Sequence, residues 1–434
     1  MASDRAMAVE GDGAHAVGDR KTVIAGAAGH FIEWYDWTIY GLMAGVFAAQ
    51  MFPASDPMVA LIAAYGTFAA GFLMRPIGSI VLSPLADRYG RTGILALTII
   101  LAGVGSLMIG LAPTYAQAGV LAPLILLAAR MLQGFATGGE YQTAAAFLNE
   151  HARPDRRAFA ASSQMVSTGL AILFAMGVAA ATAKLLPKEA LDSWGWRMPF
   201  FLGAILSAYG VWLRRSIPES RTFEVKKDRE PMSLRSIFAG FIEYPKESFI
   251  VVVIQASGVQ FYLWMVFLPT YASLSGGLPI AQGLTAGMIS LAVYTVVVSP
   301  LAALSDRIGR KPLLIASAAG FLILVYPLLQ MVKTADFNTF LMVQIAGVLL
   351  IAMNNAVIGT VFSEIFPTRL RATGIGIPYA LCVAIFGGTS PLIATYFLKN
   401  GQDQLIAYYV MIICAISILV HIFVTPETKG KTLD

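Results

Sequence analysis

Long apolar runs alternate with short polar breaks from residue 22 almost to the end of the chain. Each run is about 20 residues long or longer, which is the length that a helix needs to cross the hydrocarbon core of a membrane. The runs predict twelve spans, at 22–50, 58–84, 93–113, 119–149, 158–183, 197–215, 248–272, 281–304, 312–332, 338–362, 371–398 and 403–424. The pattern therefore predicts an all-α membrane protein.

Composition agrees with this interpretation. The 434 residues are 57% hydrophobic and only 13% charged, whereas soluble domains are about half apolar and about a quarter charged. Both cysteines, Cys382 and Cys414, fall inside apolar runs and are expected to be small core residues. A soluble globular protein is excluded, because it could not keep so much apolar surface away from water.

Polar segments divide the chain into two halves. Between the sixth and seventh runs, 217–247 carries twelve charged residues among its 31. We expect a cytoplasmic linker there, a tail at 1–21, six-helix bundles at 22–216 and 248–424, and a second tail at 425–434. The mixed charges of the first 21 residues favour a tail over a cleaved signal peptide.

Basic residues are distributed unevenly among the loops. If the N-terminal tail is cytoplasmic, 23 of the 30 Lys and Arg fall on the cytoplasmic side and five on the other. Loops rich in Lys and Arg stay in the cytoplasm. We therefore expect both termini inside, in a multi-pass protein of the cell (inner) membrane. This asymmetry also accounts for the net charge of +5 without a nucleic-acid partner.

Three polar signatures recur after matching spans of the two halves. They are Leu85-Ala86-Asp87-Arg88-Tyr89-Gly90-Arg91 with Leu304-Ser305-Asp306-Arg307-Ile308-Gly309-Arg310, Glu150 with Glu364, and Pro218-Glu219-Ser220 with Pro426-Glu427-Thr428. Parallel repeats of this kind are typical of carriers whose halves are related by an axis along the membrane normal. The repeats predict two pseudo-symmetric six-helix bundles.

The Asp-Arg-x-Gly-Arg loops resemble the signature of the major facilitator superfamily, and the resemblance covers essentially the whole chain. Further segments resemble its metabolite:proton symporter branch, namely Glu33-Trp34-Tyr35-Asp36, Phe72-Leu73-Met74-Arg75-Pro76-Ile77-Gly78 and Trp194-Gly195-Trp196-Arg197. Gly138-Gly139-Glu140-Tyr141 and Ala384-Ile385-Phe386-Gly387-Gly388 are most similar to 2-oxoglutarate and other dicarboxylate permeases. The branch also includes carriers of citrate, shikimate, aromatic acids, betaine and proline.

The resemblance implies a proton-coupled symporter that imports a small organic acid, a di- or tricarboxylate such as 2-oxoglutarate or citrate, by alternating access. Proton-coupled uptake of a zwitterionic osmolyte such as betaine or proline remains an alternative, as does an uncoupled or exporting carrier of the same fold. We expect a monomer without a cofactor or metal. The sequence offers no nucleophile and base pair, metal cluster or phosphate loop that would indicate an enzyme.

Ionisable residues at membrane depth are costly and usually functional. All five lie in the first half: Glu33, Asp36, Arg75, Arg130 and Glu140. Glu33 and Asp36 are the leading proton carriers, although one could be a fixed counter-ion. Glu140 is a further candidate for proton coupling, or it forms a gating pair with Arg75.

Arg130 is the leading candidate to bind a substrate carboxylate, because guanidinium offers two parallel donors and stays charged. The alternative is an internal ion pair with Glu33 or Asp36, and substrate and acid could also compete for it. The other expected substrate contacts are Gln133, one helical turn further on, Arg75, and the neutral Gln260, Asn355 and Tyr379 of the second half.

Aromatic residues at helical spacing occur in the first and seventh spans, at Trp34, Trp37 and Tyr40 and at Phe261, Tyr262 and Trp264. They could line a cavity, pack in the core or face lipid. An aromatic cage for a quaternary ammonium would favour betaine.

The two Asp-Arg-x-Gly-Arg loops are expected to act as cytoplasmic gates. An aspartate at a helix end can pair with nearby arginines and with the N-terminus of a helix in the opposite half. One predicted cluster comprises Asp87, Arg88, Arg91 and Glu150, and its counterpart comprises Asp306, Arg307, Arg310 and Glu364.

Overall fold

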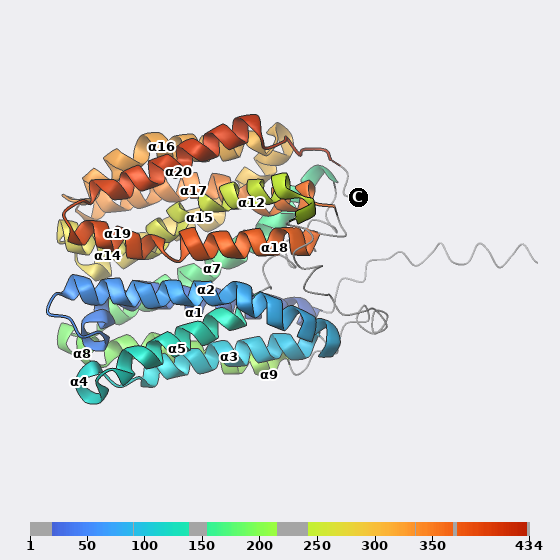
Figure 1. The fold of residues 1–434 in the computed structure, drawn as a ribbon. Helices are drawn as coiled ribbons and strands as arrows, with labels where there is room; N and C mark the ends of the chain where they lie inside the picture. The colour runs from blue at the N-terminus through green and yellow to red at the C-terminus, as the bar shows by residue number, and fades with distance from the viewer. Residues whose placement is uncertain are drawn as a thin grey trace, which may run out of the picture.

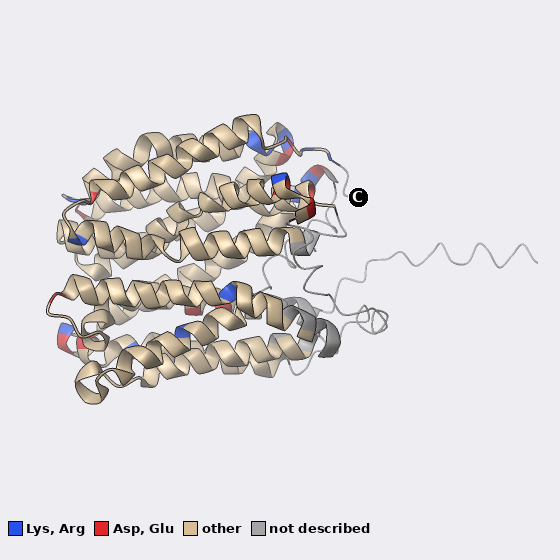
Figure 2. Ribbon diagram, viewed as in Figure 1, with Lys and Arg blue, Asp and Glu red and all other residues tan. Residues whose placement is uncertain are grey.

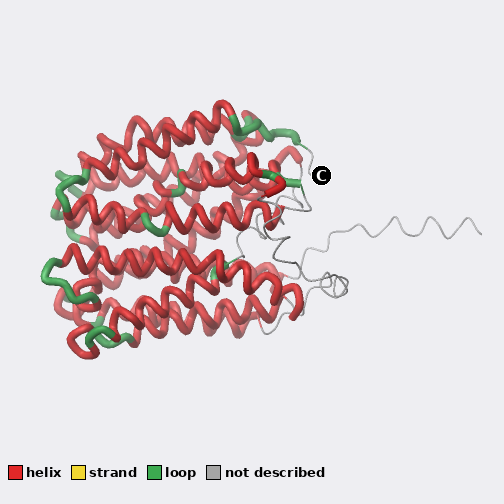
Figure 3. Tube along the Cα trace, in the orientation of Figure 1, coloured by secondary structure: helices red, strands yellow, loops and turns green. Residues whose placement is uncertain are grey.

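The computed structural model describes residues 20–89, 91–138, 154–214, 242–334, 336–367 and 371–431. Within these ranges the chain is helical and contains no strand (Figure 3). The helices run antiparallel from one end of the molecule to the other, so α1 begins and α20 ends on the same side. We call this the termini side and its opposite the far side (Figure 1).

The first half forms one bundle, drawn from blue to green in Figure 1. Its long helices in the described residues are α1 (Arg20–Met51), α2 (Pro57–Tyr89), α3 (Arg91–Leu111), α5 (Leu121–Ala136), α7 (Arg157–Leu185) and α9 (Met198–Arg214). The short elements α4 (Tyr115–Ala118), η1 (Pro154–Arg156), α8 (Lys188–Ser193) and η2 (Gly195–Arg197) join them.

The second half forms the other bundle, drawn from yellow-green to red. Its unbroken helices are α15 (Ile280–Ile308), α16 (Lys311–Val332), α17 (Phe337–Ile365) and α20 (Gln404–Phe423). Two further crossings are interrupted by π-helical turns. One runs through α12 (Pro245–Ala256), α13 (Val259–Tyr262), η3 (Leu263–Phe267) and α14 (Leu268–Gly276), and the other through α18 (Arg371–Cys382), η4 (Val383–Gly387) and α19 (Ser390–Lys399).

The observed helices coincide with the predicted spans to within a few residues at most ends. Eight helical segments in the described ranges are long and apolar enough to cross a membrane, and two further apolar helices are shorter. The fold is that of an all-α membrane bundle in two halves. For the fourth span, predicted at 119–149, the described helix ends at Ala136, and residues 139–149 lie outside the described ranges.

The predicted domain boundaries fall partly outside the described ranges. Residues 1–19 and 215–241 are not described, and the C-terminal tail is described as far as Lys431. Helix α12 begins at Pro245, inside the last residues of the predicted 217–247 linker.

Glycines let α2 and α5 touch backbone to backbone. A Cβ on Gly134 would overlap the carbonyl group of Gly71, and a Cβ on Gly71 would lie 2.9 Å from the carbonyl oxygen of Arg130. Small residues permit such close helix contacts in membranes. This contact carries the Arg130 side chain into the centre of the first bundle.

The two halves meet along several helix pairs. Helix α7 packs against α15, and Ser162 Oγ lies 2.9 Å from Ser299 Oγ across that interface. Helix α2 contacts α19, and α1 contacts η3 and α14. On the far side, Lys399 of the second half forms a 3.4 Å ion pair with Asp56 of the first. In this conformation, therefore, contacts between the halves also exist at the far side.

Candidate functional site

A cavity lies between the two halves, near the middle of the helices that surround it. It contains about 440 Å³ of empty space, part of which is open to solvent. The first half contributes Trp34, Met165 and Thr168, and the second contributes Gln255, Gly258, Phe261, Tyr262, Asn354, Asn355, Ile358 and Tyr379. A concave site between helical bundles is a common place for a small ligand.

The cavity wall combines aromatic faces with neutral hydrogen-bonding groups. Trp34 and Phe261 approach from opposite halves with a centroid distance of 5.8 Å. Asn355 Nδ2 donates to the Tyr294 hydroxyl at 2.9 Å, which fixes its amide. None of the described residues that line the cavity carries a charge. The wall can therefore contact apolar groups and bind carboxylate oxygens through neutral donors.

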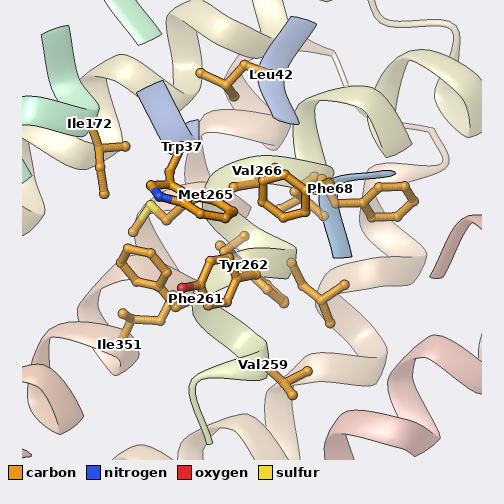
Figure 4. Packing of buried hydrophobic residues seen from close by; sticks show 14 of the residues in the cluster. Trp37, Leu42, Phe68, Ile172, Val259, Phe261, Tyr262, Met265, Val266 and Ile351 are labelled. Atoms are coloured by element: carbon orange, nitrogen blue, oxygen red, sulfur yellow. The ribbon is translucent and has the colours of Figure 1, made fainter. Parts of the chain in front are cut away.

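The break after α12 forms one side of this cavity. Helix α12 ends at Ala256, Gly258 precedes the next helical turn, and Phe261 and Tyr262 are the last two residues of that turn, α13. Figure 4 shows these two rings in the same buried cluster as Trp37 and Phe68 of the first half, and the Tyr262 ring centroid lies 5.3 Å from that of Phe72. A Cβ on Gly387, at the π-helical turn of the other interrupted crossing, would lie 2.6 Å from the Tyr262 ring. The break at Gly258 therefore borders the cavity, as irregular backbone at membrane depth is expected to do.

Asp36 lies inside the first bundle and is not part of the cavity wall. Its side chain is 2% exposed, and Oδ1 accepts a hydrogen bond of 2.8 Å from the Ser106 hydroxyl of α3. Among the described residues, Oδ2 has no hydrogen-bond partner. Gly203 of α9 lies against the carboxyl group and leaves no room for a Cβ.

Arg130 is fully buried beside Asp36. Its Nη1 donates to Gln133 Oε1 at 2.6 Å and to the main-chain oxygen of Asp36 at 3.5 Å. The guanidinium carbon lies 4.2 Å from the Trp37 ring centroid and 4.6 Å from that of Tyr40. Cation–π contacts of this kind partly replace the solvation that burial removes.

Arg75 and Glu33 lie near the cavity wall. The Arg75 guanidinium lies 4.0 Å from the Trp37 ring centroid and 4.3 Å from that of Phe72. Glu33, one turn before Asp36, is half-buried. Both side chains interact electrostatically with Tyr262 of the cavity wall. Most charges at membrane depth therefore lie in the first half, and Figure 2 shows the second half carrying its charges at the helix ends.

The structure separates the expected substrate contacts. Asn355 and Tyr379 line the cavity, whereas Arg130 and Gln133 lie deeper in the first bundle. Gln260 instead donates from Nε2 to the Cys414 sulfur at 2.9 Å. Glu140 lies outside the described residues.

Two contributors were not expected from the sequence. They are Thr168 in the cavity wall, which lies 3.0 Å from His30 Nε2, and Ser106 beside Asp36. A single serine or threonine in an apolar span is common, so neither carried a signal of its own.

The second predicted gate cluster is assembled on the termini side. Arg310 binds Asp306 at 2.8 Å and Glu364 at 3.2 Å, and Asp306 accepts from the main-chain nitrogens of Ala158 and Phe159 at 3.1 and 3.0 Å. The two nitrogens belong to the first turn of α7 in the opposite half. Asp306 thus caps a helix across the interface between the halves.

The remaining residues of the two predicted gate clusters are either outside the assembled cluster or not described. Arg307 is exposed, and Arg157 of the first half lies 3.8 Å from Glu364. The side chains of Asp87, Arg88 and Arg91, and all of Glu150, lie outside the described residues, so the first-half cluster is not described.

The C-terminal segment packs against the cluster of Asp306, Arg310 and Glu364. Glu427 accepts from the main-chain nitrogens of Arg310 and Lys311 at 2.9 and 3.1 Å, at the start of α16. Thr428 Oγ1 donates to Glu364 at 2.6 Å. Burial raises the pKa of Glu427, but the surrounding main-chain N–H donors outweigh it and hold that pKa below its ordinary value. Anions at a helix N-terminus are stabilised by such donors.

The fold and the cavity define a membrane carrier of two helical halves around a central site. Residues 21–241 match the family described as sugar (and other) transporter, and residues 280–434 match the major facilitator superfamily. Among solved structures, the D-xylose–proton symporter is similar with a TM-score of 0.74 and 20% identity, covering 95% of this chain and 99% of its own.

Curated relatives are similar along nearly the whole chain. The alpha-ketoglutarate permease of Escherichia coli (strain K12) is 31% identical over 417 residues, covering 95% of both chains. The glycine betaine/proline/ectoine/pipecolic acid transporter of Dickeya dadantii (strain 3937) is 32% identical, covering 95% of this chain and 84% of its own. The citrate-proton symporter of Klebsiella pneumoniae is 32% identical, covering 90% and 88%. The chain belongs to the major facilitator superfamily, in its metabolite:proton symporter branch, and it is a transporter, not an enzyme.

Proposed function

We propose that this protein is a proton-coupled symporter that imports a small organic acid by alternating access across the cell membrane. The observation that carries the proposal is the buried network of Asp36, Ser106, Gln133 and Arg130 in the first half, beside a cavity with a neutral wall. An acid and a guanidinium at this depth are too costly to keep without a function.

Asp36 carries the coupled proton in this proposal, and Arg130 provides the fixed positive charge that the ionised carboxylate can pair with. The substrate binds in the central cavity, where Asn355 and Tyr379 supply neutral donors to its carboxylate oxygens. Because the described cavity wall has no charged residue, the substrate's negative charge is compensated by protons that enter with it and by Arg75 nearby.

One observation favours a second candidate, a zwitterionic osmolyte. Trp34, Phe261 and Tyr262 present aromatic faces to the same cavity, and such faces attract a quaternary ammonium. Betaine and proline also carry a carboxylate that the neutral donors could hold. The two candidates therefore share the carboxylate and differ in the cation.

A thermal-shift screen of the purified protein, followed by counterflow in liposomes, distinguishes them. We expect 2-oxoglutarate or citrate to stabilise the protein and to exchange, and Asn355→Ala to weaken both effects. Asn338→Ala, at the exposed far end of the same helix, is the matched control. Stabilisation and exchange by betaine or proline alone would reject the organic-acid proposal in favour of the second candidate.

A further inference from the structure

Asp36 and Arg130 lie side by side without a direct bond between their charged groups. Arg130 Nη1 donates to the main-chain oxygen of Asp36, and the carboxyl group instead binds Ser106. Among the described residues, Asp36 Oδ2, Arg130 Nε and Arg130 Nη2 all lack a hydrogen-bond partner. A carboxyl group and a guanidinium, both with free hydrogen-bonding capacity, are therefore held apart in a site that excludes solvent.

Two neutral side chains fill the space between them. Gln133 Oε1 accepts from Arg130 at 2.6 Å, Gln133 Nε2 donates to Ser106 Oγ at 2.9 Å, and Ser106 donates to Asp36 at 2.8 Å. In this series of three hydrogen bonds, each donor is matched to one acceptor. Gln133 Nε2 also approaches the main-chain oxygen of Ala102 at 3.5 Å, which fixes the orientation of the amide.

The surroundings suit a neutral carboxyl group and a charged guanidinium. An ionised carboxylate without a charged partner costs several kcal/mol in such a site, and among the described residues Ser106 is the one hydrogen-bond donor to Asp36. Arg130 lies among the rings of Trp37, Tyr40 and Phe68, which accommodate a cation. The helices around Asp36 bring few other titratable groups. Tyr35 and Tyr40 come from α1 and Arg75 from α2, while α3 and α9 offer Ser106 and Ser207 in the described region.

We infer that Ser106 and Gln133 form a bridge that holds neutral Asp36 apart from Arg130 in this conformation. When Asp36 releases its proton to water on the termini side, the carboxylate takes the guanidinium in place of the bridge. Ser106 is a positioning residue in this account, and Gln133 acts inside the bundle and not on the substrate. The inference rests on the proposed proton coupling at Asp36. It adds the bridge that separates Asp36 from Arg130 while the carboxyl group is neutral and that is displaced when the group is ionised.

Infrared difference spectroscopy of the full-length protein in lipid, between acidic and alkaline buffer, tests the bridge without any substrate. The carbonyl band of the protonated carboxyl that is absent in Asp36→Asn belongs to Asp36. We expect Ser106→Ala to move this band to higher frequency, because the carbonyl loses its donor, and Ser106→Thr to restore it. Ser207→Ala is the matched control, since the Ser207 hydroxyl is buried and has no partner among the described residues.

Gln133→Leu is the second variant tested in the infrared experiment. It keeps a similar volume but frees Arg130, so we expect the Asp36 band to be lost at a pH where the unmodified protein shows it. The bridge is rejected if Ser106→Ala leaves the band in place, if Ser207→Ala moves it equally, or if Gln133→Leu leaves it intact. Accumulation of substrate by Asp36→Asn would instead overturn the proposed coupling, so the two failures are distinguishable.

Discussion

At the scale of single residues, the buried charged groups of the first half lie apart from the central cavity. Asp36 and Arg130 are 2% and 0% exposed inside the first bundle, whereas the described cavity wall is neutral. A carboxyl group placed this way can change its charge without touching the substrate. In the proposed mechanism, proton movement and substrate binding are then linked through the positions of α1 and α5 and not through a shared contact.

Replacement of Asp36 by Asn tests its role in coupling. We expect Asp36→Asn to keep counterflow exchange within about twofold of the unmodified rate and to lose accumulation against a gradient, because an amide cannot release a proton. Uptake and exchange in liposomes with an imposed pH gradient measure both. Full accumulation by the variant would contradict the assignment of Asp36.

Removal of one cavity donor tests the binding site. We expect Asn355→Ala to weaken substrate binding roughly tenfold, because a hydrogen bond to a charged group contributes about 1.5 kcal/mol or more. Asn338→Ala should bind as the unmodified protein does. Isothermal titration of both variants measures this, and equal affinities would remove Asn355 from the site.

At the scale of elements, the apolar runs predicted the crossings well because membrane thickness fixes their length. The π-helical turns at Leu263–Phe267 and Val383–Gly387 could not be predicted, since they depend on side chains packed from other helices. The bridge of Ser106 and Gln133 was hidden for the same reason. Helical spacing placed Arg130 and Gln133 on one face but did not say which neighbour that face meets.

The cap that Asp306 places on α7 predicts a shift in conformation when it is removed. Helix α7 has no side-chain cap of its own in the described residues, and losing a cap costs about 1 kcal/mol. We expect Asp306→Ala to increase the population of structures that are open on the termini side roughly fivefold. Electron–electron distance measurements between labels on the two halves detect this. Arg307→Ala, which changes an exposed neighbour, is the control. Equal distance distributions in both variants would show that the Asp306 cap does not hold the two halves together.

Glu427 predicts a pH dependence of the C-terminal segment. Its main-chain donors lower its pKa below the ordinary value of about 4.3. The stabilisation is therefore complete above that ordinary value and is lost as the pH falls through the lower pKa of the folded protein. A spin label on the segment should stay ordered at neutral pH and become mobile only in acid. In Glu427→Gln it should be mobile throughout, and an ordered label in that variant would refute the prediction.

At the scale of the whole molecule, two halves enclose a neutral cavity, and most charges at membrane depth lie in the first half (Figure 2). Moving one net negative charge inward costs about 2.3 kcal/mol per 100 mV of inside-negative potential. A pH gradient returns only about 1.36 kcal/mol per unit for each proton. We therefore expect at least two protons with a dianion, or one with a monoanion.

The central claim is that substrate and protons enter together. Its most direct test is the pH outside proteoliposomes that contain the purified protein when 2-oxoglutarate, citrate, betaine or proline is added without any imposed gradient. The account predicts alkalinisation of the medium by an organic acid, with about two or more protons taken up per dianion and none in Asp36→Asn. Transport of the organic acid without alkalinisation would contradict it.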